Sequence, residues 1–154
     1  MTQLRNQVLE LRAGDSYSGT ITNNKIRFVV TALTDIGAMN AYLTVADRDK
    51  NVLFTASCTP ALVAGGTFEA GTNDQFELLF VLSVANTIGL PRGHNKGLFE
   101  VSVVDSTNSF EDTPVSGRVD VLDDLKQTIT VSLAAISLLQ ALHFAADRLS
   151  SITL

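Results

Sequence analysis

The pattern of apolar and polar positions divides this chain into two regions with different periods. Up to about residue 122, apolar residues alternate with polar ones inside short segments, and Gly, Pro, Asn and Asp gather between these segments. Beyond that point the apolar period lengthens to about 3.6 residues. Because side chains alternate in strands and recur every turn in helices, we expect a mainly β domain over residues 1–123 and an α-helix over residues 124–154.

The first region contains about seven segments with the composition of β-strands. They are expected at residues 4–12, 25–33, 41–46, 52–55, 76–84, 97–104 and 118–122. Residues 76–84 are apolar at nearly every position, which indicates a strand in the middle of a sheet. The charged residues 47–51 are expected to form a hairpin tip, whereas residues 57–75 are rich in turn-forming residues and have no clear assignment. Short strands separated by such turns predict an antiparallel sandwich or barrel.

The second region carries a heptad seam, with apolar residues at alternating spacings of four and three. A second apolar row beside the seam would make a helix apolar over more than half of its circumference, so such a helix must be covered by other protein. We expect the seam to form an oligomer interface through Val131, Ala135, Leu138, Leu142, Ala145, Leu149 and Ile152.

Two starting points are possible for this helix. Asp124 and Gln127 have the spacing of a capping box, which predicts a start at Asp124. Residues 126–133 also alternate, however, so they could instead form an eighth strand, and the helix would then begin near Ala134.

Composition and charge narrow the range of partners. Apolar residues make up 45% of the 154 residues and charged residues only 18%, below the roughly 25% usual in soluble domains. The surface is therefore either sparsely charged or partly buried against partners. The net charge is −5, and the 11 Lys and Arg residues are spread singly. Without a basic stripe, we expect no nucleic acid partner.

The N-terminal sequence and the longest uncharged run indicate where in the cell the protein is expected to be located. The N-terminal residues lack a basic segment followed by an apolar run, so we expect no secretory signal and synthesis in the cytosol. Residues 129–146 are uncharged and just long enough to cross a bilayer. Polar side chains interrupt this run, which disfavours a membrane span; they are Thr130, Ser132, Ser137, Gln140 and His143.

Metal-ligating residues are sparse. Cys58 is the only cysteine, so no intrachain disulfide can form, and we expect it as a small buried side chain. His94 is expected in an exposed turn and His143 within the apolar helix, and neither belongs to a zinc-type spacing. Residues 47–51 begin like a calcium loop, but Val52 and Cys58 occupy positions that require Gly and Glu. We therefore expect no metal and no cofactor.

Signals for catalysis are also weak. Neither a nucleophile elbow nor a Gly-rich phosphate loop is present in the sequence. Several carboxylates late in the chain could act as acid and base only if the fold brought them together: Asp105, Glu111, Asp112, Asp120, Asp123 and Asp124. We interpret them as solvated loop and cap residues and expect no enzymatic activity.

Three pieces of the chain, taken in order, resemble a known module. They are LRAGDSYSGTI near the start, LPRGHNKGLFEVSVVDS in the second half and TPVSGRVDVLDD at the end of the β region. This order of motifs resembles the N-terminal immunoglobulin-like modules of tailed-phage virion proteins, such as upper-baseplate and tail-fibre-attachment proteins. The resemblance covers residues 4–123 and implies an immunoglobulin-like β-sandwich.

The resemblance implies a structural protein of a phage virion, made in the host cytoplasm. Because the chain ends soon after the module, we expect a tail or baseplate adaptor or a capsid decoration component rather than a host-recognition fibre. Its expected partners are copies of itself, as a trimer or larger, and other virion proteins. A monomeric module that binds carbohydrate or a surface receptor is the alternative, and membrane attachment through residues 129–146 is a third hypothesis.

Overall fold

The computed structural model describes residues 1–19 and 24–123, which form eight strands and one short helix. The predicted C-terminal helix lies outside the described residues. In chain order the elements are β1 (Leu4–Arg12), β2 (Ile26–Ala32), β3 (Asn40–Asp47), β4 (Val52–Cys58), β5 (Ala61–Leu62), β6 (Asp74–Phe80), α1 (Val84–Thr87), β7 (Gly93–Asp105) and β8 (Phe110–Leu122). The prediction of a mainly β domain is confirmed.

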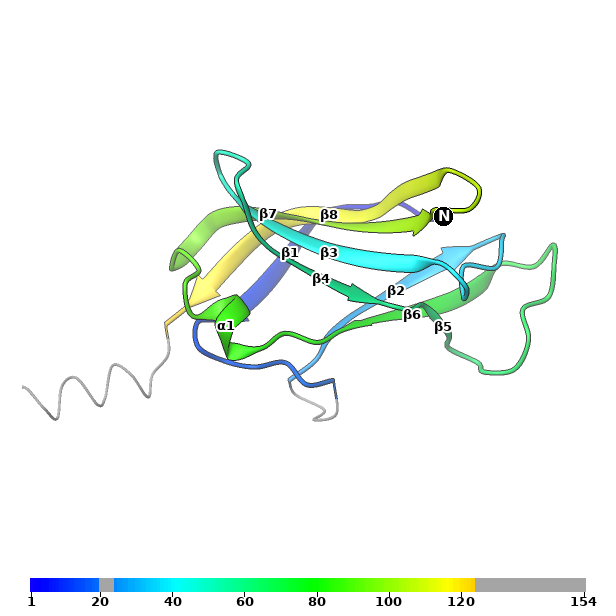
Figure 1. The fold of residues 1–154 in the computed structure, drawn as a ribbon, viewed down its shortest axis with the longest axis horizontal. Helices are drawn as coiled ribbons and strands as arrows, with labels where there is room; N and C mark the ends of the chain where they lie inside the picture. The colour runs from blue at the N-terminus through cyan, green and yellow to red at the C-terminus, as the bar shows by residue number, and fades with distance from the viewer. Residues whose placement is uncertain (20–23, 124–154) are drawn as a thin grey trace, which may run out of the picture. The chain divides into compact units, whose positions relative to one another are not determined.

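The strands form two sheets that lie one over the other (Figure 1). The larger sheet has five strands in the order β1-β8-β7-β3-β4, and the smaller has three in the order β2-β6-β5. The apolar strand β6 lies in the middle of the smaller sheet, where its sequence predicted it. Three of the six pairs of neighbouring strands, β1-β8, β7-β3 and β2-β6, are not consecutive in sequence, so connections cross between the two sheets.

Strand β1 departs from the expected antiparallel pattern, because it pairs parallel to β8. The expectation of a purely antiparallel sandwich is therefore wrong at this edge. Turn signals indicate where a strand ends, but they do not indicate which distant strand it joins. The register between β1 and β8 is also irregular between Leu4 and Gln7, where Asn6 has a positive φ of 56°, so a β-bulge interrupts the strand.

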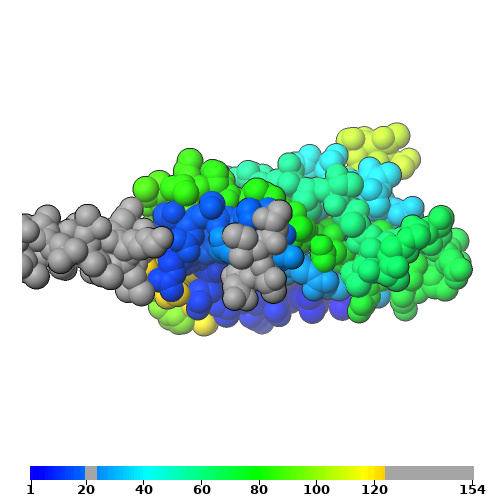
Figure 2. Space-filling model, turned by 90° about the horizontal axis from the view of Figure 1, so that it is seen from below, coloured from blue at the N-terminus to red at the C-terminus, as the bar shows by residue number. Residues whose placement is uncertain are grey.

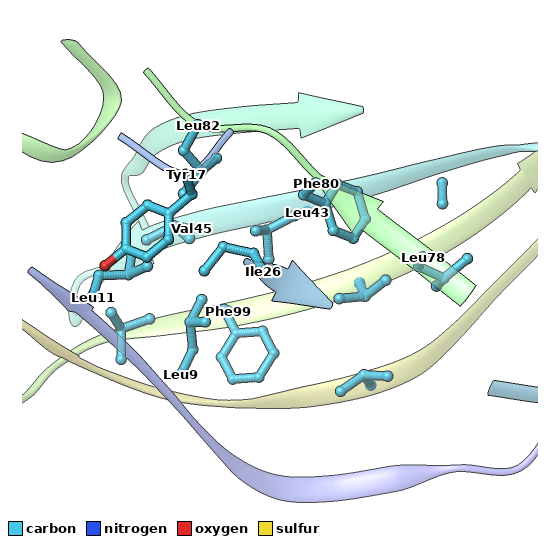
Figure 3. Packing of buried hydrophobic residues seen from close by; sticks show 14 of the residues in the cluster. Leu9, Leu11, Tyr17, Ile26, Leu43, Val45, Leu78, Phe80, Leu82 and Phe99 are labelled. Atoms are coloured by element: carbon cyan, nitrogen blue, oxygen red, sulfur yellow. The ribbon is translucent and has the colours of Figure 1, made fainter. Parts of the chain in front are cut away.

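The core lies between the two sheets. Alternate residues of each strand point inward, as in β7, where Phe99, Val101 and Val103 are at most 1% exposed. The strand predicted at residues 97–104 lies within β7, and the structure buries its Phe99 face. Figure 3 shows Leu9, Leu43 and Phe99 of the larger sheet gathered with Ile26, Leu78 and Phe80 of the smaller one. The ring of Phe28 stacks on Phe99 at 5.8 Å and meets Phe80 edge-on at 6.2 Å, so aromatic contacts join the sheets.

Strands β7 and β8 are longer than predicted. Each has 13 residues, and the region expected as a long loop before residue 118 is mostly strand β8. Pro114, which cannot donate a hydrogen bond, lies in β8 where the register with β7 shifts between Val101 and Val103. The turn between these strands protrudes at one corner of the described domain (Figures 1 and 2).

Strand β6 ends earlier than predicted, at Phe80 rather than residue 84. Leu82 instead exchanges two backbone hydrogen bonds with Tyr17, at 2.8 and 2.9 Å. The backbone N–H of Ser83 then donates to Oδ1 of Asn86 at 2.9 Å, which caps the short helix α1. The apolar run of residues 76–84 thus extends past the end of β6 to the first residue of α1, a boundary that apolarity alone does not mark.

Candidate functional site

The predicted oligomer interface cannot be located in the structure. All seven seam residues, Val131, Ala135, Leu138, Leu142, Ala145, Leu149 and Ile152, lie outside the described residues. The same holds for His143 and Asp124. The candidate sites within the described residues therefore belong to the β-sandwich.

The late carboxylates do not converge. Asp105, Glu111 and Asp112 lie around the β7–β8 turn, whereas Asp120 and Asp123 lie at the other end of β8. At about 3.3 Å per residue, the eight steps from Asp112 to Asp120 separate these carboxylates by roughly 26 Å. This distance prevents the two groups from acting together on one substrate atom.

His94, predicted in an exposed turn, lies at the start of β7 and is paired with Asp120. Its Nδ1 is 3.0 Å from Oδ2 of Asp120, and the histidine side chain is 71% exposed. The backbone N–H of Asn95 donates to the other carboxylate oxygen at 2.7 Å. This hydrogen bond, together with the nearby His94 and Arg118, holds the pKa of Asp120 below its ordinary value. The cluster ties the start of β7 to the end of β8.

The hairpin tip at residues 48–51 is closed by Asp47. One carboxylate oxygen accepts from the backbone N–H groups of Asp49 and Asn51, both at 2.9 Å, and the other accepts from the Asn51 side chain at 3.0 Å. The hydrogen bond from the Asn51 side chain contributes most to lowering the pKa of Asp47. The carboxylate is thus engaged by the tip's own donors, and the described residues contain no group of three or more potential metal ligands.

Cys58 lies at the end of β4 and is half-buried. Burial raises the pKa of its thiol to about 11. Because the thiolate is the reactive form, this environment makes the side chain a poor nucleophile near neutral pH.

The outer face of the larger sheet is hollowed by a shallow depression of about 400 Å³. Arg48 and Arg118 contribute positive charge to its lining and Glu100 a negative charge. Nε of Arg118 is buried without a hydrogen bond and lies 3.5 Å from Oδ1 of Asp120. The lining mixes polar, charged and apolar residues, unlike the mostly apolar lining of a typical small-molecule pocket. The complete lining is Asn6, Gln7, Arg48, Leu98, Phe99, Glu100, Ser116, Gly117 and Arg118.

The aromatic side chains mostly fill the core. Phe76, Phe80 and Phe99 are at most 1% exposed, and Phe68 stacks on Phe76 at 6.0 Å. Phe110, at 39%, is the one exposed phenylalanine in the described ranges 1–19 and 24–123. A sugar-binding platform requires aromatic faces open to solvent, and this part of the chain directs most of its rings inward.

Comparisons with known proteins add no family. No family model matches this chain, and a search of curated proteins found no match. Across the part of the chain that the structure describes, no helix has the length and apolarity needed to cross a membrane.

Two features of the β-sandwich were not predicted from the sequence. The bulge in β1 was missed, although Asn6 interrupts the alternation and asparagine tolerates positive φ better than most residues. The pairing of His94 with Asp120 was also missed, since these residues are far apart in sequence and no local pattern links them.

Proposed function

We propose that this chain is a non-enzymatic structural protein of a phage virion, acting as a tail or baseplate adaptor or as a capsid decoration component. In this proposal an immunoglobulin-like sandwich presents a protein-binding surface, and the C-terminal segment holds copies together. The observation that carries the proposal is the strand order of the two sheets.

The strand order supports the immunoglobulin-like part of the proposal. If the strands are assigned in chain order, β2, β6 and β5 correspond to B, E and D, and β3, β7 and β8 correspond to C, F and G. Strand β4 then takes the place of C′ beside C, as in variable-type domains. Strand β1 corresponds to an A strand that pairs with G instead of B.

The three motifs that carry the resemblance fall on or next to strands β1, β7 and β8 of the larger sheet. Gly14, with a positive φ of 83°, forms the turn after β1. The LPRG motif leads into β7, and Gly117 lies within β8. These positions support an immunoglobulin-like arrangement, and the proposed role in a virion rests on the sequence resemblance.

The C-terminal pattern supports assembly. Burying Leu138, Leu142, Leu149 and Ile152 at about 1.5–3 kcal/mol each would contribute on the order of 6–12 kcal/mol per copy before entropy costs. This is sufficient for a stable trimer or larger ring. The β-sandwich has its own core, with 23 buried apolar residues, so it does not need the seam to complete it.

Mass measurement of a chain truncated after Asp124 tests the assembly. We expect the truncated protein to remain folded, because its core forms among the described strands, and to lose the oligomeric state of the full chain. An unchanged oligomeric state would contradict the proposal.

A matched pair of substitutions in the full chain sharpens this test. Leu142→Asp places a charge in the seam, whereas Gln140→Asp places the same charge outside both apolar rows. We expect Leu142→Asp alone to lower the mass of the assembly. The virion role is tested by mass spectrometry of purified particles of the phage that encodes the chain, in which the protein should be present in stoichiometric amounts.

A further inference from the structure

The two sheets have four edge strands, and exposed edges are sites where another chain can add a strand. Three of the edges in the described domain carry protective features. Strand β1 has a bulge at Asn6 and three charged residues, and β5 is only two residues long. Strand β2 carries Arg27, which pairs with Glu77, and its end is covered where Thr2 donates to the carbonyl of Thr31 at 3.1 Å.

The fourth edge, β4, lacks these features over most of its length. Its sequence, VLFTASC, contains no charge, proline or glycine, which is the composition of segments that pair readily with other strands. A register shift opposite Ala46 places a bulge at the start of the strand, so that residues 54–58 are regular. Thr55 and Ser57 are exposed along this regular part.

The side chains of β4 are suited to pairing with an identical strand. In an antiparallel arrangement centred on Thr55, Phe54 would lie opposite Ala56 of the second copy, so a large side chain meets a small one. Thr55 would lie opposite Thr55 of the second copy, and threonine pairs are favourable across strands. Each copy contributes the same contacts, as an isologous interface requires.

The symmetry of the contact selects this orientation. The hairpin tip before β4 carries Asp47, Arg48, Asp49 and Lys50 and has no net charge, so charge does not distinguish parallel from antiparallel pairing. A two-fold axis perpendicular to the sheet reverses the strand direction, so an isologous contact between two identical edges is antiparallel.

We propose that β4 pairs antiparallel with β4 of a second copy of this chain, about a two-fold axis near Thr55, and joins two five-stranded sheets into one. The contact involves the sandwich alone and does not depend on the C-terminal seam. Where both contacts form, the seam and the β4 edge are separate contacts between copies, and each strengthens the other through effective concentration.

Sedimentation of the full chain over a wide range of concentrations tests the proposal. Thr55→Lys places a charge on the exposed edge, and we expect the mass of the largest species to fall. In the chain truncated after Asp124, where the edge contact acts alone, the same substitution should lower the mass by a factor of about two, from dimer to monomer. The matched control is Val8→Lys on β1, the opposite edge of the same sheet, where Val8 is 50% exposed. This control should leave the mass unchanged. Equal masses for wild type and Thr55→Lys, or an equal fall in both variants, would overturn the proposal.

Disulfide trapping gives a second readout that does not depend on Thr55→Lys folding. In a Cys58→Ala background, Thr55→Cys should form a disulfide-linked dimer under mild oxidation, because the two cysteines would lie directly opposite each other. Val8→Cys in the same background should remain unlinked. Absence of the Thr55→Cys dimer overturns the proposal. Truncation after Asp124 should still permit this cross-link, so failure of seam assembly and failure of edge pairing are separate results.

Discussion

The backbone of Gln7 lies directly against the α-carbon of Gly117. A β-carbon at position 117 would approach the carbonyl oxygen of Gln7 more closely than any real β-carbon contact. The bulge at Asn6 brings the β1 backbone to this position, and the absence of a side chain at Gly117 permits it. The two features together allow β1 to pair parallel to β8.

Gly117→Ala should therefore destabilise the domain by about 1–3 kcal/mol, because the β1 backbone must move away from β8. Urea denaturation measures the effect. Gly89→Ala is the matched control, because a β-carbon there would have no atom within 4 Å. Equal stability of the two variants would show that β1 does not lie against Gly117.

Lys50→Gly should stabilise the protein by up to about 1 kcal/mol, because Lys50 adopts a left-handed backbone conformation that favours glycine. Its φ is 66°, and its N–H donates to the carbonyl of Asp47 at 3.0 Å to close the hairpin tip. Thermal unfolding measures the gain. Lys50→Ala removes the same charge without relieving the backbone, so a similar gain in that variant would contradict this explanation.

Phe99→Ala should cost about 3–5 kcal/mol, because it removes a 1% exposed ring that packs between the sheets against Phe28. Leu33→Ala, at a residue that is 63% exposed, should change the free energy of unfolding by less than about 0.5 kcal/mol. Chemical denaturation of both variants checks the difference. A small effect at Phe99 would be inconsistent with a core shared by the two sheets.

Asp120→Asn should lower stability at neutral pH, and its effect should shrink in acid. The folded protein holds the pKa of Asp120 below its ordinary value of 3.8, chiefly through the N–H of Asn95 and also through His94 and Arg118. The ionised form is therefore favoured by folding. This contribution is complete above the ordinary pKa and is lost as the pH falls through the lower pKa of the folded state.

Urea denaturation at about pH 7 and about pH 3 should show the wild type and Asp120→Asn converging in acid. Glu69→Gln, which makes the same chemical change on an exposed loop, should match the wild type at both values. A difference between wild type and Asp120→Asn that does not vary with pH would argue against an ionisation effect.

Local patterns were sufficient to predict much of the domain. The alternation of residues 97–104 predicted a strand within β7, and the charged residues 47–51 predicted the hairpin tip between β3 and β4. Both predictions concern neighbouring residues. Residues 57–75 could not be assigned because β5 has only two residues and gives no periodic signal.

Less could be predicted from the sequence about the candidate site than about the fold. The sequence suggested the seam from Val131 to Ile152, which lies outside the described residues and stays a prediction. The pairing of His94 with Asp120 and the exposed edge of β4 were not predicted, because each depends on which strands become neighbours.

The sequence by itself determined where most strands lie, which of their faces are apolar and where the apolar period changes, because side-chain direction follows from the backbone within a few residues. Only the tertiary structure decided that β1 joins β8 in parallel, that β4 is left at an edge and that the carboxylates of β8 stay apart. These outcomes depend on contacts between residues up to about 110 positions apart, and such contacts are chosen by packing of the whole core rather than by any local pattern.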